Sequence, residues 1–255
     1  MDRDHSSDCI ATTLENLCRH WAERQNSDEG PYDSAMPCPF TIALSREAGT
    51  QGAAVGREVG ARLGWPVYDH ELLERIAQDL GVRTILLDRV DERRKSWLKE
   101  SFESLFGVPF VSEAAYVHRL IKTILALGAH GECIIVGRGS PFILPAASTL
   151  RVRLIGPLAD RVGAMTRELG ITPGEAHRQL QGIDRGRIKF VRDHFFKDAA
   201  DPSHYDAVLC VASYGINGCA ELIVEALRRR QASLANANQK EQNRSRRRGA
   251  LTLTL

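Results

Sequence analysis

The sequence predicts an α/β fold in which a mostly parallel sheet carries helices on both faces. From Phe40 onward, short apolar runs of strand length alternate with longer segments of helical periodicity. This alternation implies crossover connections, because consecutive parallel strands cannot be joined by a tight hairpin. A chain of 255 residues with 43% apolar residues can also bury a substantial core. We therefore expect one globular domain over residues 39–230.

The predicted elements follow one another as alternating strands and helices. Five strands are expected, at residues 40–44, 66–68, 133–136, 151–155 and 207–212. Helices are expected at 52–63, 71–80, 112–127, 157–169, 173–196 and 217–230, with a polar helical region at 84–106. In the first helix Val55, Val59 and Leu63 recur every four residues and predict a face that packs on the sheet. Thr172, Pro173 and Glu175 form a capping box before the helix at 173–196.

The two ends of the chain differ from the central domain in composition. Residues 1–38 are expected to form a partly disordered appendage with one short amphipathic candidate at 10–21. All charged residues from 228 to 255 are basic except Glu241, and residues 231–255 are expected to form a disordered basic tail. Such a tail could attract nucleic acid, although a solvated end is the more common role of this composition. No other contact with nucleic acid is expected.

Composition argues against several classes of protein. No apolar run is long enough to span a membrane, and the N-terminus lacks the pattern of a signal peptide, so we expect a cytoplasmic protein without a membrane contact. The six cysteines and eight histidines show no metal-ligand spacing, so no protein-held metal is expected. Reduced thiols are expected, with Cys133 and Cys210 buried in apolar runs.

A glycine-containing loop follows the first expected strand, in the sequence "SREAGTQGAAVG" at 45–56. Glycines allow a close backbone approach, and free N–H groups at the start of the following helix favour an anion. A P-loop would place Lys and Ser or Thr directly after its last glycine, whereas Gly52 is followed by Ala53 and Ala54. The loop by itself is compatible with a phosphate site and with a simple strand-to-helix turn.

Four further segments join this loop in a common pattern, and the five are "TIALSREAGTQG" (41–52), "RLGWPVYDHELL" (62–73), "RVDERR" (89–94), "CIIVGRGSPFILP" (133–145) and "DRGRIKFVRDHFFKDAADPSHYDAVLCVAS" (184–213). Together they resemble the cytidylate kinase-like family of P-loop nucleoside monophosphate kinases. The resemblance extends from about residue 40 to 228 and implies a three-layer fold with a five-stranded sheet and a helical lid. It also implies that ATP, with Mg²⁺ carried by the nucleotide, is bound at the first loop. In standard bacterial cytidylate kinases, Asp stands at the position of Gly139.

The donor phosphates are assigned by this resemblance to the first loop. Gly49, Thr50, Gln51 and Gly52 would hold them through their main-chain N–H groups. Arg46, which ends the first strand, is the best local substitute for the missing lysine, although it could instead pair with Glu47 or Asp69.

The acceptor phosphate and the lid are assigned to residues from other segments. Arg138 would grip the acceptor monophosphate, with a structural ion pair as the alternative. Asp184 and Arg187 share a helix face and would act from the lid, whereas Arg192 points partly away and is a weaker acceptor-site candidate. Asp69 is a candidate for the acceptor site, or simply a helix cap.

These assignments imply transfer of the ATP γ-phosphoryl group to a (d)CMP-like acceptor. The missing lysine leaves open a second interpretation, a nucleotide-binding or regulatory domain of the same fold with weakened catalysis. A non-nucleotide acceptor is a third interpretation, because the fold does not fix the substrate.

Overall fold

The computed structural model describes residues 40–78 and 112–252. The expected appendage at 1–38, the polar helical region at 84–106 and the segment 89–94 lie outside these residues. Five strands form one sheet: β1 (Thr41–Arg46), β2 (Val67–Tyr68), β3 (Cys133–Val136), β4 (Thr149–Ile155) and β5 (Ala207–Cys210). The helices are α2 (Gly52–Leu63), α3 (His70–Gln78), α6 (Ser112–His130), α7 (Ser140–Ile143), α8 (Leu158–Leu169), α9 (Pro173–Phe195) and α10 (Val211–Thr252).

The sheet is parallel throughout, with strand order β2-β3-β1-β4-β5. β1 lies at its centre, paired to β3 on one side and to β4 on the other. β2 and β3 lie on one side of β1, and β4 and β5, which follow them in the chain, lie on the other side. The direction in which strands are added to the sheet therefore reverses at β1. In open α/β sheets, ligands bind beyond the carboxyl ends of the strands at such a reversal. The predicted fold class, an α/β fold with a five-stranded parallel sheet, is confirmed.

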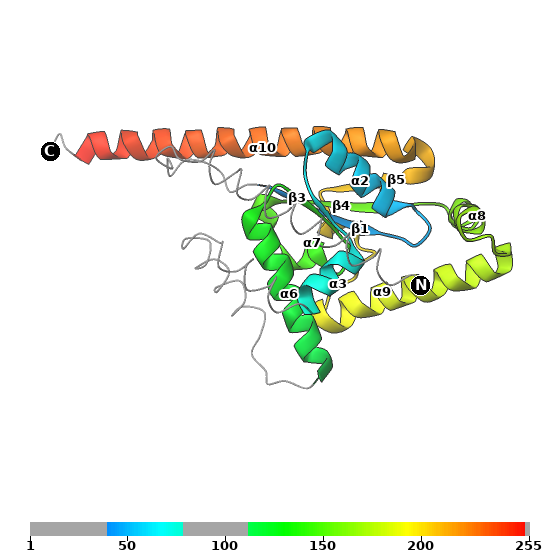
Figure 1. The fold of residues 1–255 in the computed structure, drawn as a ribbon. Coiled ribbons are helices and arrows are strands. Elements are labelled where there is room, and N and C mark those ends of the chain that lie inside the picture. Colours follow the sequence, from blue (N-terminus) through cyan, green and yellow to red (C-terminus); the bar gives the residue numbers. More distant parts are fainter. Residues whose placement is uncertain (1–39, 79–111, 253–255) are drawn as a thin grey trace.

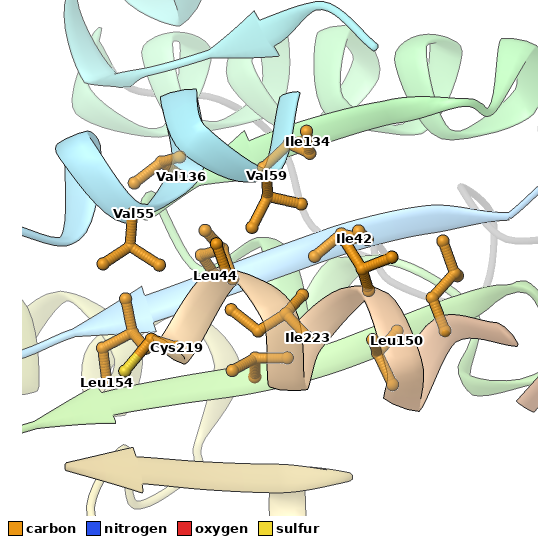
Figure 2. Packing of buried hydrophobic residues seen from close by; sticks show 14 of the residues in the cluster. Ile42, Leu44, Val55, Val59, Ile134, Val136, Leu150, Leu154, Cys219 and Ile223 are labelled. Atoms are coloured by element: carbon orange, nitrogen blue, oxygen red, sulfur yellow. The ribbon is translucent and has the colours of Figure 1, made fainter. Parts of the chain in front are cut away.

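Side chains alternate between the two faces of the sheet and build two core layers. Ile42 and Leu44 of β1 join α2 and α10 on one face, and Figure 2 shows them beside Val55 and Val59 of α2 and Ile223 of α10. Ala43 faces the opposite layer, which packs on α3, α6 and α7. Figure 1 shows α2 and α10 together on one side of the sheet, away from α3, α6 and α7. The sheet is therefore buried on both faces, as expected for parallel strands.

Several predicted features are confirmed in detail. α2 has the predicted bounds, Val55 and Val59 are fully buried, and Leu63 packs at the edge of the same layer. The capping box before α9 is formed, because Thr172 Oγ1 accepts from the Glu175 N–H and the Glu175 carboxylate accepts from the Thr172 N–H. Cys133 is buried, whereas Cys210 is only half-buried, contrary to expectation.

The C-terminal elements differ from the prediction. β5 ends at Cys210, and α10 begins at Val211 and continues to Thr252, in place of a strand to residue 212 and a helix at 217–230. Gly215 has a non-helical conformation inside α10 and marks the point where two helical segments meet. Residues 231–252, expected to be disordered, are helical and contain many good helix formers and no proline. In Figure 1 this end of α10 extends beyond the sheet.

Candidate functional site

The segment from the last residue of β1 to the first residue of α2, residues 46–52, lies at the carboxyl edge of the sheet and is called the phosphate loop below. Gly49 has φ +77° and Gln51, the N-cap of α2, has φ +53°. Gln51 provides no side-chain cap to the helix. Among the described residues, the main-chain N–H groups from Gly49 to Ala53 find no hydrogen-bond acceptor. The loop thus presents consecutive donors and a positive helix end to an anion.

Arg46 crosses from β1 over the start of α2 to the end of β3. A Cβ atom added to Gly52 would lie 2.9 Å from Cβ and 3.0 Å from Cγ of Arg46, so the arginine stem lies against this glycine. A Cβ atom on Gly137 would overlap Nη1 of Arg46, so the guanidinium lies against the loop after β3. Glycines at both positions are what allow the arginine to take this path.

The Arg46 guanidinium is mostly buried, and within residues 40–78 and 112–252 it forms no hydrogen bond or ion pair. Its pKa is lowered to about 10, first by burial and then by the nearby Arg187 and Arg138, while Asp69 partly offsets these effects. The pKa of Arg187 is lowered by burial and by Arg138, against the influence of Asp184. Three arginines from β1, the loop after β3 and α9 are therefore close enough to repel one another. An anion between them would relieve this repulsion.

Arg138 lies two residues after the end of β3, has φ +51° and belongs to this cluster. Its Nη2 lies 3.0 Å from Nδ1 and 2.8 Å from Nε2 of His70, at the start of α3. Arg187 reaches the same region from α9, where its Nη1 donates to the Arg46 carbonyl oxygen at 3.0 Å. The structure thus brings together Arg46, Arg138 and Arg187, which the sequence assigned to three different segments.

A cavity of about 330 Å³ opens beside the phosphate loop on the β4 side. It is lined by Gly49, Thr50 and Gln51 of the loop, by Gly156, by small and charged residues of α8, and by Val211 and Ala212 at the start of α10. The volume lies at the lower end of the range for small-molecule sites, about 300 to 1,000 Å³. Three of the four loop residues assigned to the donor therefore line a real cavity.

Asp184 of α9 lies against the phosphate loop. Its Oδ1 accepts from the Ala48 N–H at 2.7 Å, and its Oδ2 accepts from Arg161 Nη1 of α8 at 2.6 Å. Both carboxylate oxygens are therefore engaged by the protein. The side chain holds neighbouring segments together at the edge of the site.

The remaining candidates have local roles in the structure. Asp69 Oδ1 accepts from the Leu72 N–H at 3.2 Å and caps α3, while its charge also acts on Arg46. Arg192 is 66% exposed and pairs with the adjacent Asp193, so it does not join the arginine cluster. Its predicted orientation, partly away from Arg187, is confirmed.

Sequence reasoning missed two residues of the site, Glu47 and Arg161. Glu47 follows Arg46 in the sequence and contacts the segments after β4, and Arg161 contacts both the phosphate loop and α9. Glu47 stood in the Ser-Arg-Glu segment and could have been singled out there. Arg161 lies more than 100 residues from the loop and carries no local signal, so only the fold reveals its position.

Residues 40–78 and 112–252 contain neither a candidate metal centre nor a candidate membrane-spanning helix. No group of three His, Cys, Asp or Glu residues among them is arranged to hold a metal ion. No helix in the same ranges has both the length and the apolar composition needed to cross a membrane.

Among the solved structures that are similar to this chain, one with a TM-score above 0.5 supports the fold. A crystal structure of an uncharacterized protein from Eubacterium ventriosum has a TM-score of 0.58 at 20% identity, covering 73% of this chain and 96% of its own. Shikimate kinase from Bacteroides thetaiotaomicron has a TM-score of 0.41 at 14% identity, covering 74% of this chain and 98% of its own. Gluconokinase from Sinorhizobium meliloti has a TM-score of 0.38 at 16% identity, covering 81% of this chain and 99% of its own.

Sequence comparison is more specific than these structural likenesses. No curated protein matches the chain significantly. The sequence profile of the cytidylate kinase-like family matches residues 41–213, which include the phosphate loop, Arg138 and the α9 residues Asp184 and Arg187. Since this match spans well over half of the chain, the protein belongs to the cytidylate kinase-like family.

Proposed function

We propose that the protein is a phosphotransferase that moves the γ-phosphoryl group of ATP to a (d)CMP-like nucleoside monophosphate. The observation that carries the proposal is the Arg46 guanidinium, which is mostly buried beside two other arginines and has no anionic partner within hydrogen-bond distance among the described residues. Burying a cation in this way is unfavourable unless an anion completes the site. Triphosphate and monophosphate groups are anions of the required kind.

On the donor side, the main-chain N–H groups from Gly49 to Ala53 would hold the phosphates at the start of α2. The adjacent cavity, lined by small and charged residues of α8 and by Val211 and Ala212, would hold the rest of the nucleotide. Arg46 would supply the positive charge that a P-loop lysine usually supplies. Mg²⁺, when it is bound with the nucleotide, would neutralise charge on the phosphates.

On the acceptor side, Arg138 would hold the monophosphate through its planar guanidinium. An acceptor phosphate oxygen would form the new bond to the γ-phosphorus while the bond to the ADP oxygen breaks. Arg46 and Arg187, close to Arg138, would stabilise the negative charge spread over the transferred group. Closure of α8 and α9 over the site would exclude water. The proposal includes a cytoplasmic location, where both substrates are available.

The loop after β3 differs from that of standard bacterial cytidylate kinases at Gly139, on the acceptor side of the site. Gly139 has φ +73°, and a Cβ atom there would overlap Cε2 of Phe195. The Asp found at this position in standard bacterial cytidylate kinases would therefore collide with the aromatic ring. For this reason the acceptors tested should include purine and pyrimidine monophosphates and also non-nucleotide alcohols.

A coupled assay of ADP release with Mg·ATP and this panel tests the proposal. We expect at least one nucleoside monophosphate to raise ADP release well above the rate with ATP alone, and Arg138→Ala to reduce this rate about 100-fold or more. If no acceptor raises the rate, the kinase proposal fails for these acceptors. If ATP nevertheless raises the melting temperature, the second interpretation holds, a nucleotide-binding domain with weakened catalysis.

A further inference from the structure

Arg161, in the first turn of α8, connects three separate segments around the phosphate loop. Its Nε donates to the carbonyl oxygen of Gly156 at 3.0 Å, and its Nη1 donates to the carbonyl oxygen of Ala48 at 3.2 Å. The same Nη1 donates to Asp184 Oδ2 at 2.6 Å. The Arg161 side chain is only 12% exposed. One guanidinium thus links the segment after β4, the phosphate loop and α9.

The main-chain groups of Ala48 are held from both sides by this arrangement. Its N–H donates to Asp184 Oδ1 at 2.7 Å, and its carbonyl oxygen accepts from Arg161. Because Asp184 and Arg161 also bond to each other, the three residues form a closed ring of hydrogen bonds. Ala48 directly precedes the consecutive N–H groups proposed to hold the donor phosphates. The orientation of the Ala48 main chain therefore determines the direction in which the following N–H groups point.

Glu47 strengthens the same connection from the preceding position. Its Oε2 accepts from the Gly156 N–H at 3.1 Å and lies 3.6 Å from Arg161 Nε. Its other carboxylate oxygen lies 3.8 Å from Arg153 of β4. The charges of two carboxylates and two arginines thus offset one another around the loop; these residues are Glu47, Asp184, Arg153 and Arg161. In the cluster of Arg46, Arg138 and Arg187, by contrast, burial and like charges lower the pKa of Arg46 and of Arg187.

Gly49 shows how closely α8 and α9 approach the loop. A Cβ atom at this position would lie 2.8 Å from the Arg161 carbonyl oxygen and 2.9 Å from Cδ2 of Leu180. A shift of α8 or α9 would therefore either push the phosphate loop or break the contact of that helix with the loop. The contact is too close for the loop and the helices to move independently.

We infer that the Arg161–Asp184 pair is the joint that couples α8 and α9 to the phosphate loop. The pair positions the loop N–H groups for the donor, and a bound donor in turn favours the closed arrangement of the two helices. Arg161 and Asp184 are thus positioning residues that act through the main chain of Ala48. The inference rests on the proposed function, because it takes the phosphate loop as the donor site.

Three variants of the full chain test the joint: Arg161→Ala, Asp184→Ala and the double variant. Calorimetric titration with Mg·AMPPNP, a non-hydrolysable ATP analogue, measures donor affinity. We expect each single variant to bind roughly tenfold or more weakly, and the double variant no more weakly than the worse single variant. Amide hydrogen exchange over residues 46–54 should become faster in every variant, while the melting curves show that the rest of the fold persists.

A conservative variant and a matched pair serve as controls. Asp184→Asn keeps an acceptor for the Ala48 N–H but loses the charge that pairs with Arg161, so an intermediate loss of affinity is expected even if the alanine variants unfold. Glu225 and Arg229 form an ion pair of 2.7 Å on the exposed side of α10. Alanine at either position should leave affinity and loop exchange unchanged.

The outcomes separate this inference from the proposed function. If the wild-type protein binds Mg·AMPPNP and the variants bind it equally well, the joint is refuted while the proposed function stands. The same conclusion follows if the losses of binding free energy in the two single variants simply add in the double variant. If the wild-type protein does not bind, the proposed donor site fails. Loop exchange then decides whether the pair still holds the loop: faster exchange in the variants supports it, and unchanged exchange refutes it.

Discussion

Arg46 carries a positive charge at a position where burial and the like charges of Arg187 and Arg138 destabilise its protonated form. Its folded-state pKa of about 10 lies well below the ordinary value of an arginine guanidinium. The protonated form is therefore destabilised by folding, and this penalty is present at every pH below about 10 and disappears as the pH rises above it. A residue retained at such a position is expected to serve binding at the expense of stability.

Arg46→Met should accordingly stabilise the protein in the absence of ligands. Methionine can follow the path of the arginine stem without burying a charge, so we expect the free energy of unfolding at pH 7.5 to rise by about 1 to 3 kcal/mol. Chemical denaturation measures this change. Arg57→Met, on the exposed face of α2, is the control and should change little. A clear loss of stability in Arg46→Met would show that Arg46 has a stabilising partner.

The sequence predicted Arg46, Arg138 and Arg187 as site residues because each lies in a segment that resembles the family. Their mutual repulsion could not be predicted, because it depends on how closely three distant segments approach. Asp184 was assigned to catalysis from its segment, while the structure shows both of its oxygens engaged by Ala48 and Arg161. A side chain's type and spacing do not reveal which partner occupies it.

At the scale of elements, the phosphate loop depends on the close packing of α8 and α9 over Gly49. Gly49→Ala would introduce a Cβ atom within 3 Å of both helices at a residue with φ +77°. We expect a loss of about 1 to 3 kcal/mol in the free energy of unfolding, together with weaker binding of Mg·AMPPNP. Gly174→Ala is the control, since no atom lies within 4 Å of its added Cβ. Equal behaviour of the two variants would contradict the packing described.

The start of α9 is fixed by the capping box of Thr172 and Glu175. Thr172→Ala removes an acceptor from the Glu175 N–H and should cost about 0.5 to 2 kcal/mol of stability. Thermal unfolding should show a melting temperature lower by a few degrees, about 2 to 4 °C per kcal/mol for a protein of this size. An unchanged melting temperature would mean that packing alone positions this helix.

Local patterns predicted most elements, because periodicity and capping act within a few residues. α2 was predicted to its end residues, since Val55, Val59 and Leu63 mark one face and Gly64 follows. β5 and α10 were predicted less well, because the apolar run 207–212 does not reveal where a strand becomes a helix. The short helix α7 was missed, since four residues are too few for periodicity.

At the scale of the whole molecule, the sheet and its two layers form the folded unit, and α10 extends beyond them (Figure 1). Leu227 is buried in the layer of α2 and α10, and Leu234 packs at its edge. Removal of residues 237–255 should therefore leave the melting temperature within about 2 °C of the full chain and leave donor binding unchanged. A large drop in the melting temperature would mean that this segment stabilises the domain.

The central claim is that the main-chain N–H groups of the phosphate loop and the Arg46 guanidinium together hold a triphosphate. Arg46 would act there in place of the lysine of a usual P-loop. The most direct test is the affinity for Mg·AMPPNP of the wild-type protein, Arg46→Lys and Arg46→Met, measured by calorimetry in one buffer. We predict that the wild-type protein binds, that Arg46→Met binds at least about tenfold more weakly, and that Arg46→Lys lies between them. Equal affinity of the wild-type protein and Arg46→Met, or no binding by the wild-type protein, would contradict the claim.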